Sequence, residues 1–163
     1  FGFIKFYNQA NLEQNIHLKH LGPEPLSSEF NIGYFKNYIE GKQRVVKNIL
    51  MDQRFISGLG NIYVNEILFF SGVKPSKKIK KLSDLEIQKI IKFSKKIISK
   101  AIILGGSSIK DFSSSSGKKG SFQQHFSVYG KKGDKCSNKN CSNNILKIVL
   151  SNRASFFCSK CQK

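Results

Sequence analysis

The chain has 163 residues and a strongly basic composition, with 28 Lys and Arg against 10 Asp and Glu and a formal net charge of +18. Its hydrophobic content of 39% supports a packed core. No apolar run approaches eighteen residues, which excludes a membrane-spanning helix. The positive charge makes a polyanion the expected partner, either nucleic acid or an anionic membrane surface.

The N-terminal segment, residues 1–7, is rich in aromatics and predicts a strand that has no partner strand nearby. Such a strand is a liability unless a further sheet covers it, and the chain starts at Phe1 rather than Met. We therefore expect a piece of a longer protein. Residues 8–22 are polar and irregular, and the Gly-Pro-Glu-Pro sequence at residues 22–25 marks a boundary.

The middle of the chain is helical by its apolar periodicity. We expect helices over residues 28–38, 42–51 and 62–70, the last one preceded by Gly58 and Gly60. Two glycines before a helix leave the first amide N–H groups bare, and such a terminus attracts phosphate. A plain helix-start turn explains the same pattern, so both interpretations stay open here.

The clearest helix follows a Ser-Asp-Leu-Glu capping box at residues 83–86 and ends at Gly105 and Gly106. Its apolar residues are expected to share one buried face, and its lysines the opposite, solvated face. The apolar set is Ile87, Ile90, Ile91, Ile97, Ile98, Ala101 and Ile102, and the lysines are Lys89, Lys92, Lys96 and Lys100. The Ser/Gly/Lys-rich residues 105–122 then predict either a linker or a loop that closes over a substrate.

All four cysteines lie in the last twenty-eight residues, as Cys136-x4-Cys141 and Cys158-x2-Cys161. This spacing favours a zinc ribbon, with one structural Zn²⁺ held by four thiolates, over two disulfides. The sixteen residues between the pairs contain two apolar runs around a turn at residues 151–154, which predicts a β-hairpin with Arg153 at its tip. The three histidines stand in no metal-binding pattern. The fold class is therefore mainly α with a small β zinc ribbon.

Five segments together resemble one family: residues 21–26 (LGPEPL), 58–66 (GLGNIYVNE), 105–112 (GGSSIKDF), 128–133 (VYGKKG) and 152–158 (NRASFFC). The chain resembles the C-terminal part of bacterial formamidopyrimidine-DNA glycosylases, although the gap in its first cysteine pair is wider than the common two residues. The resemblance implies the end of an N-terminal β-sandwich domain over 1–22, a helix–two-turn–helix domain over 23–112, a lesion-capping loop and connection over 113–127, and a zinc finger over 128–163.

The resemblance also implies a function, namely excision of oxidised purines and nicking of the abasic site by β,δ-elimination. The expected partner is double-stranded DNA with oxidised bases or abasic sites, bound by a monomer in the bacterial cytoplasm. Asn61 and Arg153 match the family's phosphate-gripping residues, and Arg153 its proton donor for δ-elimination. The other DNA contacts implied are Gly60, Lys42, Lys47 and, as the wedge that fills the gap in the base stack, Phe1.

The family's catalytic proline and glutamate and its β-elimination lysine have no counterpart in these 163 residues. We therefore expect this chain alone to bind DNA without cleaving the glycosidic bond. Two rival hypotheses are an endonuclease VIII-like enzyme for oxidised pyrimidines and a non-catalytic zinc-ribbon module that binds nucleic acid. A basic protein of the membrane surface is a third, less favoured because the apolar stripe of residues 87–102 fits a core.

Overall fold

The computed structural model describes residues 4, 6, 15, 16, 18–107 and 120–163 of the chain. It is mainly helical with one two-stranded antiparallel hairpin, which confirms the predicted fold class. The strand expected over residues 1–7 and the wedge residue Phe1 lie outside the described residues, apart from Ile4 and Phe6, which belong to no strand. Most of the predicted capping loop (residues 108–119) also lies outside them. None of the described helices is long and apolar enough to cross a membrane.

Helices α1 (Ile32–Ile39) and α2 (Val46–Leu50) both begin later than predicted. The helix α1 starts after Asn31, whose side-chain oxygen accepts a hydrogen bond from the Tyr34 amide at 3.0 Å, so Asn31 is the N-cap and the helix does not begin at residue 28. The helix α2 is delayed because Val45 is extended and forms an isolated β-bridge with Lys78. Pairing with a residue that is distant in the sequence thus overrides the helical pattern of residues 42–45.

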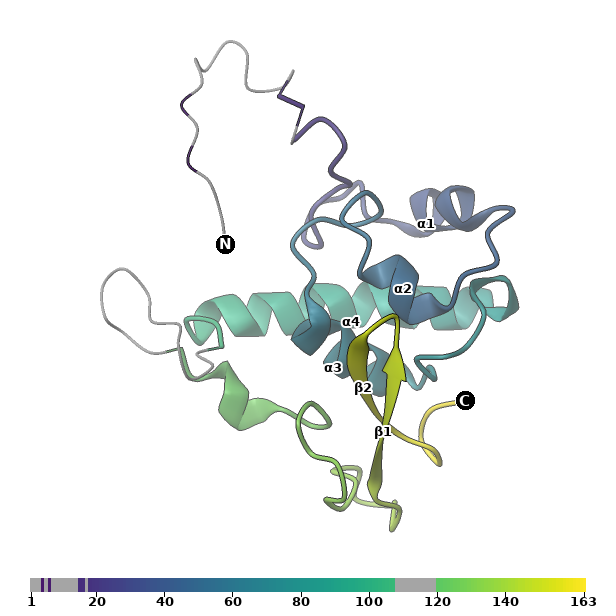
Figure 1. Ribbon diagram of the computed structural model, residues 1–163, viewed down its shortest axis with the longest axis vertical. Helices are drawn as coiled ribbons and strands as arrows, with labels where there is room; N and C mark the ends of the chain where they lie inside the picture. The colour runs from purple at the N-terminus through teal and green to yellow at the C-terminus, as the bar shows by residue number, and fades with distance from the viewer. Residues whose placement is uncertain (1–3, 5, 7–14, 17, 108–119) are drawn as a thin grey trace.

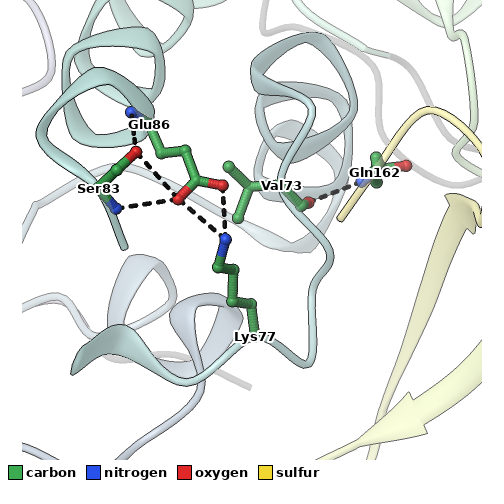
Figure 2. Close-up of polar contacts among 5 residues, drawn as sticks. All are labelled: Val73, Lys77, Ser83, Glu86 and Gln162. Carbon is green, nitrogen blue, oxygen red and sulfur yellow. Dashed lines mark hydrogen bonds and ion pairs between the residues drawn. The ribbon is translucent and has the colours of Figure 1, made fainter. Parts of the chain in front are cut away.

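Helices α3 (Asn61–Ser71) and α4 (Asp84–Ile103) pack against each other and form the centre of the helical part (Figure 1). Gly60 is the N-cap of α3, and Gly72 ends it in the left-handed conformation with φ of 73°. The predicted capping box of α4 is present, with Ser83 and Glu86 bonding reciprocally, and Glu86 also forms an ion pair with Lys77 at 2.7 Å (Figure 2). Beyond the other end of α4, Gly105 and Gly106 both have positive φ, as expected for glycines that end a helix.

The core of the helical part is built from buried aliphatic side chains around a cluster of aromatic rings. Phe55 lies at its centre, with the rings of Phe30, Phe35 and Tyr38 within 5.9 Å between centroids. Of the predicted apolar face of α4, Ile102 is an exception and is 64% exposed. The surface beside it includes Gly58, Gly105 and Gly106, which have no side chains to cover it.

The C-terminal part is a hairpin of β1 (Ile145–Leu150) and β2 (Arg153–Cys158), lying in front of α3 in Figure 1. It follows the short 3₁₀ helix η3 (Phe122–His125) and a basic turn. A second, smaller core joins the hairpin to the helices through Phe69 of α3. The chain end is anchored as well, because the Gln162 side chain donates to the Val73 carbonyl at 2.9 Å (Figure 2).

Candidate nucleic-acid interface and metal centre

The four predicted cysteine ligands come together at the base of the hairpin. Their sulfur atoms all lie within 4.8 Å of one another, with 3.8 Å between Cys136 and Cys161 and 3.6 Å between Cys141 and Cys158. A tetrahedral ion with metal–sulfur bonds of about 2.3 Å needs sulfur atoms roughly 3.8 Å apart, whereas a disulfide bond is about 2.05 Å long. The residues therefore fit a tetrahedral metal ion, and the wider gap in the first pair does not disturb the geometry.

The electrostatics of the four thiols point to the same conclusion. Burial, reinforced by the neighbouring thiols, raises the pKa of Cys161 to about 12. Burial also acts to raise the pKa of Cys158, but hydrogen bonds from backbone groups of Cys161 and Lys160 and from neighbouring thiols hold that pKa below its usual value. Four thiolates so close together repel one another, so they can all ionise only around a cation. The cysteine cluster can thus hold a metal ion.

The tip of the hairpin differs from the prediction in one respect. The turn consists of Ser151 and Asn152 alone, with φ of 47° and 58°, and Arg153 is already the first residue of β2, paired with Leu150. Two consecutive positive φ angles are typical of the tight two-residue hairpin turn that matches the twist of the strands. Arg153 is exposed and stands beside the turn rather than within it.

Side chains from two helices meet the backbone next to Arg153. The Ala154 carbonyl accepts hydrogen bonds from Lys47 Nζ at 2.7 Å and from Asn61 Nδ2 at 3.1 Å. Lys47 Nζ also donates to Ser155 Oγ at 2.7 Å. The end of the hairpin is therefore held by α2 and by the first residue of α3, directly next to Arg153.

Lys47 is 1% exposed, which is unusual for a lysine. Burial, together with a smaller contribution from the nearby Arg153 guanidinium, lowers its pKa to about 8. Its ammonium group is thus held in place by the two hydrogen bonds to the hairpin at an electrostatic cost.

A hollow of about 280 Å³ opens between α2 and the hairpin tip, on the side where Arg153 lies. Its polar walls are ordered, because Arg44 forms a 2.7 Å ion pair with Asp52 and the Asn48 side chain donates to Ser151 Oγ at 2.8 Å. Cationic groups of Arg44 and Arg153 therefore border one concave surface.

The remaining predicted DNA contacts lie apart from this group or border it. Gly60 precedes Asn61 at the start of α3, and a β-carbon added there would meet no atom within 4 Å. Lys42 lies in the connection from α1 to α2, where its Nζ packs 4.3 Å from the centroid of the Tyr38 ring.

Two buried polar residues of α3 were missed by the sequence analysis. Asn65 Oδ1 accepts from the Phe156 amide at 2.6 Å, and the Glu66 carboxylate accepts from the amides of Ser127, Val128 and Tyr129 at 2.8–3.0 Å. Both side chains are buried and join α3 to the part of the chain that carries the cysteine cluster. The only signal for them was a polar Asn-Glu pair inside an otherwise apolar helix.

Comparisons with known proteins agree with this geometry. A model of the formamidopyrimidine-DNA glycosylase H2TH domain matches residues 21–113, more than half of the chain. The chain belongs to the formamidopyrimidine-DNA glycosylase family. The resemblance predicted from the five segments is thus confirmed.

Individual family members are similar over nearly the whole chain. The formamidopyrimidine-DNA glycosylase of Bacillus subtilis (strain 168) is 42% identical, over 99% of this chain and 58% of its own length. The complex between the Lactococcus lactis Fpg and an abasic site containing DNA has a TM-score of 0.85 at 35% identity, covering 95% of this chain and 56% of that one. A Lactococcus lactis Fpg mutant with a Fapy-dG containing DNA gives 0.86 and 34%, with 95% and 56% covered. The chain therefore spans somewhat less than three-fifths of the length of these relatives.

Proposed function

We propose that this chain is the damaged-DNA-binding part of a DNA glycosylase of base-excision repair. The observation that carries the proposal is that Lys47 and Asn61 both hold the Ala154 carbonyl, next to the exposed Arg153 and beside the bare start of α3. Related proteins with this fold have been solved with abasic and Fapy-dG containing DNA. The partner would accordingly be double-stranded DNA that contains an oxidised base or an abasic site, bound by a monomer.

The chemistry of the group suits a DNA backbone. The planar guanidinium of Arg153 can hold a phosphate through two hydrogen bonds, and the free N–H groups at the start of α3 offer further donors. Gly60 leaves the space before the helix open, so a phosphate can approach the backbone closely. Contacts of this kind position a protein without reading sequence, which suits an enzyme that must find damage anywhere.

The activity proposed for the whole protein is removal of oxidised purines, followed by strand cleavage at the abasic site. In that reaction Arg153 would be the proton donor for δ-elimination. Lys42 and Phe1 stay proposed DNA contacts. Lys47 has both of its described hydrogen bonds directed at the hairpin, so we propose that it serves DNA binding by positioning Arg153.

The metal proposed for the cysteine cluster is one Zn²⁺ ion, for which four thiolates in a tetrahedron are a common structural site. With all four positions taken by protein, such an ion supplies no open position for water or substrate. Its contribution is to hold the hairpin rigid, so that β2 presents Arg153 beside Asn61.

The proposal is tested by titrating duplexes that contain one abasic-site analogue at a fixed salt concentration. Arg153→Ala is expected to weaken binding by about 1–3 kcal/mol, the usual range for a hydrogen bond to a charged group. Arg153→Lys keeps the charge but loses the bidentate geometry, so it should restore only part of the affinity. Lys80→Ala removes one exposed charge from the short helix η2 (Ile79–Lys81) and serves as the control. Equal loss in Arg153→Ala and Lys80→Ala would refute the phosphate clamp.

The catalytic expectation is separate and concerns the 163-residue polypeptide alone. We expect borohydride to trap no covalent adduct between it and an 8-oxoguanine duplex, because no counterpart of the family's nucleophilic proline occurs in this sequence. An intact relative serves as the positive control. A trapped adduct with this chain would show that another amine forms the Schiff base.

A further inference from the structure

A second hollow lies between α3, α4 and the 3₁₀ helix η3, which is the short green helix of Figure 1. Its volume is about 230 Å³, and its walls are largely apolar, with Phe70, Phe93, Ile97 and Phe122. The rings of Phe70 and Phe93 stack at 5.7 Å between centroids, and Phe70 is 44% exposed. The hollow is therefore preformed by packed aromatic side chains, and part of its apolar surface faces solvent.

The rim of this hollow is cationic. Lys96, Lys100 and His125 border it, and Lys89 and Lys92 continue the line along the same exposed face of α4. Within the described part of the chain, none of the four lysines forms an ion pair, since the acidic partners found there pair with Lys36, Arg44 and Lys77. The stripe thus presents uncompensated positive charge beside an apolar hollow.

An acidic residue lies at the floor of the hollow, but it does not neutralise the rim. The carboxylate of Glu66 already accepts three backbone hydrogen bonds from residues 127–129, at 2.8–3.0 Å. These three amides, which precede the cysteine cluster in the chain, stabilise its negative charge. Lys96 and Lys100 consequently remain available to an anion that arrives from outside.

We propose that this hollow is a docking site for an acidic peptide segment of a partner protein, with one large apolar or aromatic side chain inserted between Phe70 and Phe122. The volume lies below the roughly 300–1,000 Å³ of typical small-molecule pockets and suits a single side chain. Flanking carboxylates of the peptide would pair with Lys96 and Lys100. A second copy of this chain is a poor occupant, because its net charge of +18 would repel the stripe.

The site is separate from the proposed DNA contacts. Glu66 and Phe70 lie five and nine residues beyond Asn61 along α3, which places them about 7–13 Å further along the helix axis. The Asn65 side of α3 faces the hairpin, whereas the hollow opens toward α4 and η3. A peptide there would recruit the protein to a partner while the hairpin tip holds DNA.

The test uses a fluorescein-labelled ten-residue peptide of Asp and Glu with one central Phe, titrated with the chain at low salt and followed by fluorescence anisotropy. A matched peptide carries Ser in place of the Phe. We expect the Phe peptide to bind about tenfold more tightly or better, because an aromatic ring is buried. Lys96→Glu combined with Lys100→Glu should reduce its affinity by about tenfold. The matched control, Lys89→Glu combined with Lys92→Glu, changes the net charge equally but leaves the hollow intact, so it should lose much less.

Three results would overturn the proposal. Equal binding of the Phe and Ser peptides would show general attraction of charges only. Equal losses in the two double variants would show that the hollow is not the site. Displacement of the peptide by a single-stranded oligonucleotide of the same charge, at lower concentration than by unlabelled peptide, would assign the surface to nucleic acid instead.

Discussion

Lys47 shows how a single buried charge can position an exposed one. Its ammonium group is almost fully removed from water, a situation that is tolerated only when hydrogen bonds replace the lost solvation. Both described bonds go to the hairpin strand that begins with Arg153. Burial and the nearby Arg153 guanidinium both lower the pKa of Lys47, while Arg153 itself is exposed.

The lowered pKa predicts a specific pH dependence of stability. Between about pH 8 and the ordinary lysine pKa of 10.5, the unfolded chain keeps a proton on Lys47 that the folded chain has released. The unfolded state then binds more protons, so the free energy of unfolding rises with pH in this window. Relative to Lys47→Met, the wild type should gain about 2 kcal/mol between pH 7 and pH 9.5.

Urea unfolding of both proteins with saturating metal at the two pH values measures this difference. Lys80→Met, at an exposed position, is the control and should show a constant difference from the wild type. A constant or decreasing difference for Lys47→Met would mean that Lys47 stays charged and well solvated in the folded protein.

At the scale of the elements, two glycines with negative φ have opposite roles. Gly22 lies in the Gly-Pro-Glu-Pro boundary, and a β-carbon there would stand 2.5 Å from the Phe55 carbonyl carbon and oxygen. These are backbone atoms that cannot move aside cheaply. Gly60 has open space around it at the start of α3.

We therefore predict a reversal between two equivalent substitutions. Gly22→Ala should destabilise the fold by about 1–3 kcal/mol through overpacking, whereas Gly60→Ala should cost less than about 1 kcal/mol as a changed N-cap. If phosphate approaches the start of α3, Gly60→Ala should also weaken binding of abasic-site DNA. Thermal unfolding measures the stability of each variant, and titration measures its DNA affinity. Unchanged DNA affinity in Gly60→Ala would separate Gly60 from the binding surface.

The fold could be predicted from the sequence wherever an element is determined by residues within it or directly beside it. The capping box at Ser83 and Glu86, the glycines after α4 and the cysteine spacing all act locally, and the structure shows each in its predicted place. The predicted start of α2 was wrong because a distant chain segment decides it, through the bridge from Val45 to Lys78. The burial of Lys47 also depends on a strand more than a hundred residues away, so no local sequence pattern indicates it.

The molecule as a whole combines two cores of unequal size. The helical part has an extended buried cluster of its own, whereas the cluster around the hairpin contains six buried residues, of which Cys136 and Cys158 are candidate metal ligands. The Asn65 and Glu66 side chains of α3 accept hydrogen bonds from backbone amides of the smaller part, and the Val73 carbonyl after α3 accepts one from the Gln162 side chain. We therefore expect the small core to need a metal ion for rigidity, whereas the helical core should stay folded without one.

This asymmetry predicts what removal of the metal does. Chelation should abolish protection of the amides in residues 136–163 against hydrogen exchange, because the four cysteines lose the ion that links them and the remaining core is small. Protection in α3 and α4 should persist, since their buried faces pack mainly on each other. Affinity for abasic-site DNA should fall by about tenfold or more, because Arg153 is no longer presented beside Asn61, and should return when Zn²⁺ is added.

The variant Gln162→Ala separates the metal from the anchoring of the chain end. Gln162 accepts from the Cys158 amide at 2.9 Å and donates to the Val73 carbonyl at 2.9 Å, so its loss removes the side-chain link between the Cys158–Cys161 pair and the helices without removing a ligand. The backbone hydrogen bonds of Lys163 to Gly72 and Lys74 remain. Metal content should stay at one ion per chain, while exchange at residues 158–163 becomes faster.

In the chelation experiment, loss of protection throughout α3 and α4 would instead show that the two cores form one cooperative unit, in which the metal supports the entire fold.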